Sequence, residues 1–333
     1  MATRLVQLLD PDGRRGLASV EGDQLRLLWA KMSAYEAARF AIDSCRPLSE
    51  VIASDSGGVR LNYDDVHALR TEWRVLPAFD HPFEPSRCLV SGTGLTHLAS
   101  AKNRQAMHAG AADLTDSMRM YLWGEEGGKP VAGGIGVAPE WFYKGSGEIL
   151  RGHGEDLLIP PYAGDGGEEP EIAGAYIIDP DGTPRRLGFM IANEFSDHRT
   201  EKKNYLYLAP SKLRNCAVGP ELVVTDSFDS VPGVVSIRRH GEVVWSKEIT
   251  TGEENMCHSL ANLEHHHFKF EQHRRPGDVH VHFFGADAFS FGAGVELEDG
   301  DVMEVAFEGM GRPLRNTLRR SKEPDRLRVV TAL

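Results

Sequence analysis

The chain has 333 residues, 41% of them apolar and 26% charged, which is the composition of an ordinary soluble globular protein with room for one large and one small domain. Its net charge of -12 argues against a nucleic-acid or anionic-membrane surface as its main partner. The four cysteines include no CxxC pair, which disfavours a zinc cluster or a disulfide framework. Because no segment is apolar enough for a signal peptide or a membrane span, we expect a cytoplasmic enzyme.

Residues 1–84 are predicted to form a small N-terminal α/β domain. Short strands are expected at 4–9 and 25–28. A helix is expected after Ser33, because Glu36 follows it at the spacing of a capping box. No residue pattern in this part indicates chemistry, so a lid or docking domain is the plain interpretation.

Residues 85–333 are predicted to form the catalytic domain, which is strand-rich and lacks the regular βαβ alternation of a doubly wound sheet. Helices are expected at 96–107 and near 256–268. The glycines that crowd 124–147 indicate loops and tight strands. Further strands are expected at 88–90, 216–224, 233–238, 243–245 and 278–284, followed by a last hairpin through 298–301.

The most informative stretch is a pair of apolar runs on either side of a turn centred near Gly182. The first run reads as a strand, so Glu169 and Glu171 point to the same face. An antiparallel hairpin with this centre would place Glu171 opposite Glu194, with their Cβ atoms about 5 Å apart. Three carboxylates should therefore converge, at a cost in free energy unless a cation lies among them.

Several short motifs follow one another around this hairpin in a recognisable order. They are Pro139–Lys144 (P-x-x-F-x-K), Glu155–Pro161 (I-x-L-P), Glu169–Glu171 (E-x-E), Gly188–Ser196 (G-Y-x-x-x-N-D-x-S), Ser211–Val223 (K-S-F-D, then G-P-x-L-V), Arg275–Val279 (P-G-D-x), Glu298–Asp301 (G-D) and Arg312–Thr317 (L-x-N-x). Each motif is weak by itself. Their order and spacing resemble those of the fumarylacetoacetate hydrolase superfamily over about residues 88 to 319.

The resemblance implies an α+β fold, a mixed β-sandwich roll that is usually dimeric, with a magnesium or manganese ion at the site. Carried over to this chain, the metal ligands are Glu169, Glu171 and Glu194, the last standing where most members have Asp. Carboxylate oxygens suit a hard cation such as Mg²⁺. A Glu on a strand is more often a solvated side chain, but the hairpin and the motif order favour the metal.

Two lysines stand where the family has basic residues. Lys144 and Lys212 are predicted to reach a 2-oxo acid, holding its carboxylate or stabilising charge on its ketone. A solvated surface chain is the commoner role of a single lysine. The context after the hairpin favours a site role for Lys212 more strongly than for Lys144.

The departures from the family limit the chemistry. Relatives that cleave acylpyruvates carry a His–Glu pair that activates water, whereas His97 has no Glu three residues on. The stretch 195–199 reads F-S-D-H-R rather than x-S-A-R-D, and the T-G-T-P segment is absent. Carbon–carbon bond hydrolysis is therefore disfavoured, while the metal-enolate half of the machinery is retained. His97, which opens a helix beside a glycine turn, is the candidate general acid or base.

Half of the fourteen histidines lie between 258 and 282. Asp278, His280 and His282 alternate and would share one face of a strand. A second metal site or a proton relay is one interpretation, but no zinc motif matches, and consecutive histidines 265–267 on a helix cannot all face one ion. Hydrogen-bonded or interface histidines are the preferred interpretation.

The sequence is thus predicted to encode a lyase, a Mg²⁺-dependent dehydratase that converts 2-keto-3-deoxypentonate into 2,5-dioxopentanoate (α-ketoglutaric semialdehyde) in sugar-acid catabolism. This substrate follows from similarity to the sugar-acid branch of the superfamily, since the residues alone indicate only a metal-enolate site. We expect the protein to form a homodimer and to bind a small 2-oxo acid as its substrate. Mn²⁺ is the alternative ion. The alternatives are an acylpyruvate or 2,4-diketo sugar-acid hydrolase and a metal-binding regulatory protein without catalysis.

Overall fold

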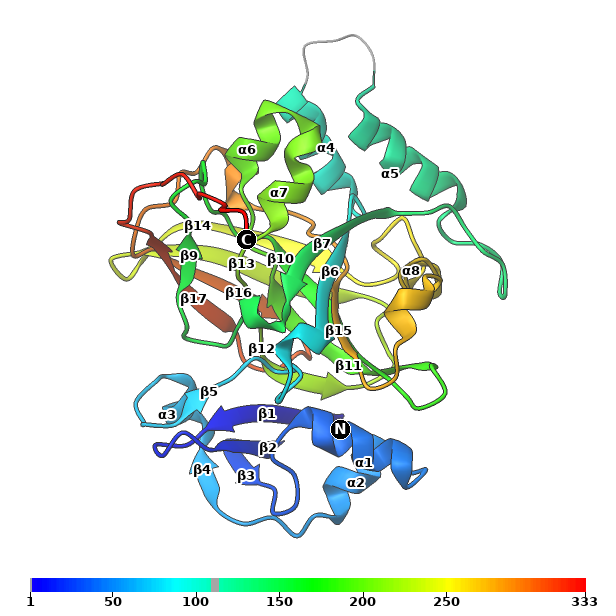
Figure 1. Ribbon diagram of the computed structural model, residues 1–333, viewed down its shortest axis with the longest axis vertical. Helices are drawn as coiled ribbons and strands as arrows, with labels where there is room; N and C mark the ends of the chain where they lie inside the picture. Colours follow the sequence, from blue (N-terminus) through cyan, green and yellow to red (C-terminus); the bar gives the residue numbers. More distant parts are fainter. Residues whose placement is uncertain (1, 109–113) are drawn as a thin grey trace.

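The computed structural model describes residues 2–108 and 114–333 and is built on two β-sheets (Figure 1). The larger sheet has twelve strands and is mixed, because β15 and β6 run parallel while most other pairs are antiparallel. Its main path is β4 (Arg60–Asn62), β3 (Gln24–Leu27), β2 (Arg15–Glu21), β1 (Thr3–Leu9), β12 (Cys216–Val224), β11 (Pro184–Asn193), β10 (Pro170–Ile178), β15 (Val279–Phe283), β6 (Cys88–Gly94) and β7 (Glu140–Ser146), with β5 (Arg74–Val75) on β1 and β8 (Leu150–Arg151) on β12. The predicted strand-rich, mixed architecture is confirmed.

The smaller sheet has five strands and packs against the middle of the larger one. In spatial order they are β14 (Glu242–Thr251), β13 (Val231–Arg239), β16 (Val302–Phe307), β17 (Leu314–Arg320) and β9 (Leu157–Ile159). The α-helices are α1 (Ala34–Asp43), α2 (Leu48–Ser54), α3 (Tyr63–His67), α4 (Leu98–His108), α5 (Asp116–Gly127), α6 (His198–Lys203), α7 (Leu208–Lys212) and α8 (Leu260–Phe268). No helix within the described residues is long and apolar enough to cross a membrane.

The central strand β10 is buried along its whole length. Ile172 and Tyr176 belong to the core shared with the smaller sheet, whereas Ala175 and Ile177 belong to the core that includes residues of α1. A strand covered on both faces explains why the sequence reads as a nearly continuous apolar run. Each large side chain buried in this way contributes about 1.5–3 kcal/mol, so β10 is a firm support for the acidic residues at its start.

The N-terminal strands continue the larger sheet, because β1 pairs antiparallel with β12 and places Leu5 opposite Leu222. Helix α1 begins as predicted, since the Ser33 hydroxyl accepts the backbone N–H of Glu36 and the Glu36 carboxylate accepts the backbone N–H of Met32. The proposed domain boundary near residue 84 stays a prediction.

Helices α4 to α7 gather at the end of the roll that lies away from the N-terminal unit (Figure 1). The loops predicted around 124–147 were wrong at their start, because α5 continues to Gly127. Gly124 lies in this helix for a packing reason, since a Cβ there would be 2.6 Å from the Cys257 sulfur. Glycine therefore marks a close contact between elements at this position, and not a loop.

The predicted last hairpin was also misplaced. Residues 298–301 form a turn that precedes β16, and the connection between β16 and β17 runs through 308–313. Gly309 and Gly311 take positive φ values of 75° and 93° in that connection, a conformation that favours glycine. The Glu298–Asp301 turn looked equally suitable in the sequence because Gly300 also has a positive φ, of 97°.

Candidate metal centre

Three glutamates mark the open end of the β10–β11 hairpin. Glu169 precedes β10, Glu171 is its second residue, and Glu194 follows β11. The predicted pairing of Glu171 with Glu194 was wrong, because Glu171 lies opposite Ala192. Glu194 is instead bound to Glu169, whose carbonyl oxygen accepts the Glu194 backbone N–H at 2.9 Å.

The register differs from the prediction because the turn closes nearer to the N-terminus than expected. Ile178 lies opposite Pro184 and Tyr176 opposite Arg186, and this pairing continued without interruption would place Glu171 three residues short of Glu194. An irregularity in β11 offsets part of this difference, because Ala175 lies opposite Gly188 and Leu187 is left outside the pairing. A bulge of this kind adds one residue to one strand, so the partner of Glu171 differs from the prediction by two residues.

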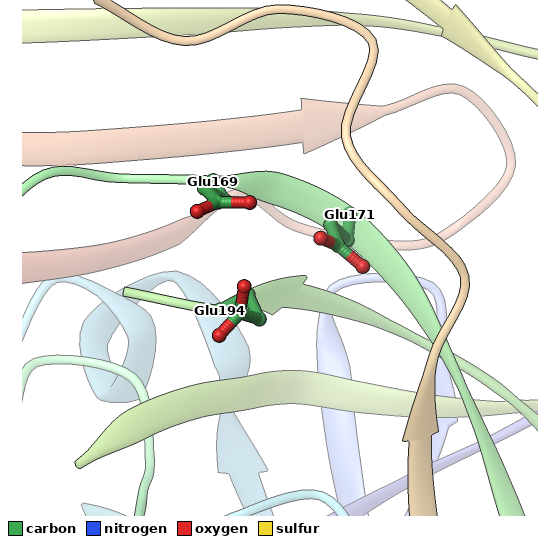
Figure 2. A group of neighbouring side chains, drawn as sticks. All are labelled: Glu169, Glu171 and Glu194. Atoms are coloured by element: carbon green, nitrogen blue, oxygen red, sulfur yellow. The ribbon is translucent and has the colours of Figure 1, made fainter. Parts of the chain in front are cut away.

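The carboxylates nevertheless converge as predicted (Figure 2). Glu169 and Glu171 point from one strand toward Glu194 on the next, and each offers an oxygen that lies within 4.8 Å of the other two. All three side chains are buried. Their convergence is confirmed, whereas their role as metal ligands stays a prediction.

Lys212, at the end of α7, brings one ammonium group to this cluster. Its Nζ lies 2.7 Å from Glu169 Oε1, bonds Glu194 Oε2 and lies 2.9 Å from the Ser196 hydroxyl. The amine is fully buried, so it depends on these acceptors in place of water. Lys212 is thus directly part of the carboxylate cluster.

Lys144 brings the second ammonium group from β7. Its Nζ lies 2.6 Å from Glu194 Oε1 and also donates to the backbone carbonyl oxygens of Glu194 and Phe195. Two of its acceptors are main-chain atoms, so Lys144 holds the chain that leaves β11 as well as the Glu194 side chain. Both predicted lysines are therefore brought to the carboxylates.

Glu169 and Glu171 have pKa values shifted in opposite directions. Burial, and then the neighbouring carboxylates of Glu194 and Glu169, raise the pKa of Glu171 well above its usual value, although Gly285 donates its N–H to Glu171 Oε2 at 2.7 Å. Burial also opposes ionisation of Glu169, but Lys212, His198 and Arg104 together outweigh it and hold the Glu169 pKa well below its usual value. Among the described residues, Glu171 is thus the carboxyl group of the three that forms no ion pair.

A hard divalent cation fits this arrangement. The donors are carboxylate oxygens, and no thiol or imidazole belongs to the group of potential ligands found among the described residues. Mg²⁺ prefers such oxygen donors. Its charge would supply the cation that Glu171 lacks, so Glu169, Glu171 and Glu194 are the residues that would hold it.

His97 lies just before α4 and is buried. The Thr96 hydroxyl donates to the Phe284 carbonyl at 2.7 Å and is 2.9 Å from His97 Nδ1, so Nδ1 must carry the proton and donate to that hydroxyl. Nε2 is left as an acceptor without a partner in the part of the chain that the structure describes. Burial alone lowers the His97 pKa to about 4. Its catalytic role stays a prediction.

A network of hydrogen bonds and ion pairs beside the carboxylate cluster was not predicted from the sequence. The Glu140 carboxylate accepts a hydrogen bond from the Tyr205 hydroxyl, while its Oε2 has no partner within residues 2–108 and 114–333. Arg104 pairs with Glu201 at 2.6 Å and reaches to 3.9 Å from Glu169 Oε2. Burial raises the Glu140 pKa against the opposing pull of Arg104, which favours a neutral carboxyl group there.

One signal in the sequence could have pointed to Glu140, and one contact in the structure accounts for it. It alternates with Phe142 and Lys144 on β7, so the three share one face of the strand. Gly94 lies opposite Glu140 on β6, and a Cβ there would be 1.9 Å from Glu140 Oε2. The glycine thus makes room for the carboxyl group.

The histidine-rich segment forms a separate buried cluster. The Trp141 indole N–H donates to His267 Nδ1 at 3.2 Å, so His267 Nε2 carries the proton and donates to His280 Nδ1 at 2.9 Å. His273 bonds the His267 carbonyl oxygen through its Nδ1 at 2.6 Å. The hydrogen-bonded interpretation of these histidines is confirmed.

His282 completes the histidine cluster, which we define as His267, His273, His280 and His282. Its two ring nitrogens lie 2.9 Å from the hydroxyl groups of Ser91 and Thr93. Burial, and then the neighbouring imidazoles, lower the pKa of His280 and His282 to about 3 and that of His267 well below its usual value. His267, His280 and His282 are therefore neutral at physiological pH.

No protein-family model and no curated protein matches the sequence. Among solved structures, a 2-keto-3-deoxyarabinonate dehydratase superposes with a TM-score of 0.73 at 20% identity, covering 96% of this chain and 100% of that one. A 2-keto-3-deoxy-D-arabinonate dehydratase complexed with magnesium and 2,5-dioxopentanoate gives 0.71 at 19% identity, with the same coverage. The 2-hydroxyhepta-2,4-diene-1,7-dioate isomerase from Mycobacterium marinum gives 0.58 at 16% identity, covering 97% of this chain and 100% of that one.

The chain has the fumarylacetoacetate hydrolase fold. The resemblance inferred from the order of its motifs is thereby confirmed at the level of the fold. Identities of 16–20% carry the fold alone, so the chemistry has to be argued from the residues of the site.

Proposed function

We propose that this protein is a Mg²⁺-dependent dehydratase of a 2-keto-3-deoxy sugar acid, converting 2-keto-3-deoxypentonate into 2,5-dioxopentanoate. The observation that carries the proposal is the buried cluster of three carboxyl groups with two ammonium groups among them. The two solved dehydratases of similar fold support it, one of which holds magnesium and 2,5-dioxopentanoate. Mn²⁺ is the alternative ion.

A bound Mg²⁺ would act as a Lewis acid toward the C1 carboxylate and C2 ketone of the substrate and lower the pKa of the C3 hydrogens. The residues around it supply the remaining needs of the reaction. Lys212 lies in the cluster, so its ammonium group can balance negative charge on the substrate. Lys144 fixes Glu194 and the chain beside it.

Loss of the C4 hydroxyl requires an acid that is protonated at neutral pH. Glu140 is our candidate for this acid, because burial raises its pKa and its Oε2 accepts no hydrogen bond from the described residues. A base removes one C3 proton, and Glu140 gives a proton to the departing hydroxyl, so water leaves. A proton shift from C5 to C3 then gives an enol, and transfer of the enol hydroxyl proton to C4 yields the aldehyde. His97 Nε2, an unprotonated acceptor, is the candidate base.

The direct test measures the semialdehyde formed from each enantiomer of 2-keto-3-deoxypentonate in the presence of saturating Mg²⁺. We expect product from one enantiomer, its loss after treatment with a chelator, and its return when Mg²⁺ is added. Glu140→Gln, which keeps the shape but cannot donate a proton, should slow the reaction by about 100-fold or more. Absence of semialdehyde from both enantiomers would contradict the proposal.

The hydrolase alternative is the weaker candidate. The hydroxyl of Thr96 is the partner of His97 Nδ1, and within the described residues no carboxylate pairs with this histidine. A water-activating His–Glu pair is therefore missing at this position. Release of pyruvate from an acylpyruvate would favour the hydrolase.

We further propose a cytoplasmic homodimer. The expectation follows from the resemblance to the superfamily and is open to direct measurement. Sedimentation velocity at micromolar concentration should give a species of twice the mass of the chain, and a single species of the chain mass would contradict it.

A further inference from the structure

A short segment after β15 clasps the strand that carries the glutamates. We define residues 284–291 as the strap. Its Gly285 N–H donates to Glu171 Oε2 at 2.7 Å, and Ser290 donates both its N–H and its hydroxyl to the Glu168 carboxylate, at 2.6 and 2.8 Å. The strap therefore bonds Glu168 and Glu171, which flank Glu169, directly. It contacts Glu169 itself only through another residue.

That indirect contact runs through His198, the first residue of α6. The imidazole is completely buried, and its Nε2 lies 3.1 Å from Glu169 Oε1. Its ring stacks on two residues of the strap, with centroid distances of 4.7 Å to Phe289 and 5.1 Å to Phe291 and interplanar angles of 7° and 29°. A residue stacked in this way has little freedom to turn its nitrogen away from Glu169.

The surroundings of the ring fit this role. Gly167 lies beside it, and a Cβ at that position would be 2.6 Å from His198 Nδ1, so only glycine leaves room for the imidazole. Gly167 and Ser196 exchange two backbone hydrogen bonds of 3.0 Å, which bring the chain before β10 next to the chain after β11. His198 stands where the resembled motif has Arg, so the imidazole contact with Glu169 is a departure of this chain from that motif.

Glu169 needs such a support because a glutamate side chain has three rotatable bonds and must keep one oxygen available for an ion. Oε1 accepts hydrogen bonds from both His198 Nε2 and Lys212 Nζ, at 3.1 and 2.7 Å. Oε2 accepts no hydrogen bond from the described residues, and the Arg104 guanidinium is 3.9 Å away. The two donors thus fix one oxygen and leave the other free.

We propose that His198 is a positioning residue that, held by the aromatic rings of the strap, orients Glu169 and thereby sets the affinity of the centre for its divalent ion. This inference rests on the metal site of the proposed function and adds a residue outside the ligand set. Removing a hydrogen-bonding partner of a metal ligand costs about 10- to 100-fold in affinity or activity in other metalloproteins.

The test is Mn²⁺ binding, followed by the electron paramagnetic resonance signal of the free ion, which requires no substrate. His198→Phe keeps an aromatic ring on the strap but removes the donor, and should raise the Kd for Mn²⁺ at least about tenfold. His198→Gln restores an N–H donor and should return the Kd to within about threefold of the wild-type value. Phe289→Leu leaves the histidine but removes one ring contact, and should weaken binding by about three- to tenfold.

His153→Phe is the matched control. His153 is also buried and stacked, on His67 at a centroid distance of 4.0 Å, but its bonds go to backbone atoms of His67 and Arg315. This variant should leave the Mn²⁺ Kd unchanged. Thermal unfolding of each protein without metal shows whether it folds, and Phe289→Leu keeps the test valid if His198→Phe does not.

The outcomes separate the two hypotheses. If the wild-type protein binds no Mn²⁺, the metal centre itself is wrong. If it binds Mn²⁺ and folded His198→Phe binds it equally well, or His153→Phe weakens binding as much, the positioning role of His198 is wrong while the metal centre stands.

Discussion

The proposed metal centre and the histidine cluster are both buried, and β7 contributes to each, yet they meet the cost of burial in opposite ways. Lys144 from β7 forms an ion pair in the first, whereas Trp141, three residues earlier, donates to His267 of the second. In the first, Glu169 and Glu194 are paired with ammonium groups. In the second, hydrogen bonds take the place of charge pairs, and the pKa values of His267, His280 and His282 are lowered.

The difference indicates which cluster can bind a cation. The lone pairs of His267 and His280 already accept hydrogen bonds, so neither nitrogen is free to hold a metal ion. Among the described residues Glu171 forms no ion pair, and its pKa is raised mainly by burial and by the carboxylates beside it. A surplus of carboxyl groups indicates a binding site, whereas imidazole lone pairs that already accept hydrogen bonds indicate a structural role.

The largest effect is expected from Glu194→Gln, which removes one charge from the metal centre. Activity should fall at least about 1,000-fold, which corresponds to roughly 4 kcal/mol of transition-state stabilisation. Mn²⁺ binding should be lost with it. Glu194→Asp is the matched control, because it keeps the charge and restores the acid of the resembled motif. Retained activity in Glu194→Gln, with circular dichroism unchanged, would overturn the ligand assignment.

Lys144→Met tests whether the ammonium groups are needed for folding. Its removal takes one of two ammonium groups from Glu194 and leaves two backbone carbonyl oxygens without their buried donor, so the free energy of unfolding should fall by about 3–5 kcal/mol. Urea denaturation measures this change. A loss below about 1 kcal/mol would mean that water replaces the ammonium group and that this region is more open than its burial suggests.

The histidine cluster should make the protein sensitive to acid. The pKa values of His280 and His282 are lowered to about 3 in the folded protein, while an unfolded chain has a histidine pKa near 6.5. The unfolded state therefore binds more protons below that value. Stability should be fully present above about pH 6.5 and decline as the pH falls toward 3, by on the order of 3 kcal/mol for each histidine.

Urea denaturation measures how the free energy of unfolding depends on pH. A range of roughly pH 4 to 8 covers the unfolded histidine pKa. His282→Gln should reduce the slope, because it removes one of the groups that titrate only after unfolding. His240→Gln, at a solvent-exposed turn, is the control and should leave the slope as it is. An identical slope in wild type and His282→Gln would show that His282 is not held neutral.

The smallest effect is expected from Trp141→Phe. The change removes the indole N–H that donates to His267 but keeps an aromatic ring, so it should cost about 1 kcal/mol of stability. Activity should stay within about twofold, because Trp141 points to the opposite face of β7 from Glu140 and Lys144. A large loss of activity would mean that the two clusters are coupled through β7.

The sequence identified the carboxylates of the proposed metal centre but not their pairing. Glu169, Glu171 and Glu194 stood out because carboxylates are rare in apolar runs, and the strand period places the first two on one face. Their register depended on where the turn closes, with Ile178 opposite Pro184, and on the bulge at Leu187, which has no marker in the sequence. Glu140 was overlooked because its role requires knowing that Gly94 lies opposite it, which is a contact between distant segments.

His198 was outside the reach of the sequence for a similar reason. The proposed role of His198 depends on stacking against two phenylalanine rings that lie more than ninety residues further along the chain. The strap carries these rings back over β10 to the histidine. The departure from the resembled motif at 195–199 pointed to this segment, but not to its partner.

The pairing of β1 with β12 carries a practical consequence for anyone who would trim this protein. Removing the first 84 residues would take away β1, so the edge of β12 that it covers at Leu222 and Val223 would be left open while β12 keeps its pairing with β11. Bare edges of this kind recruit other strands, so the shortened chain would self-associate more readily than it would behave as an isolated catalytic module. The N-terminal unit thus serves as an edge guard, and a minimal active protein has to include it.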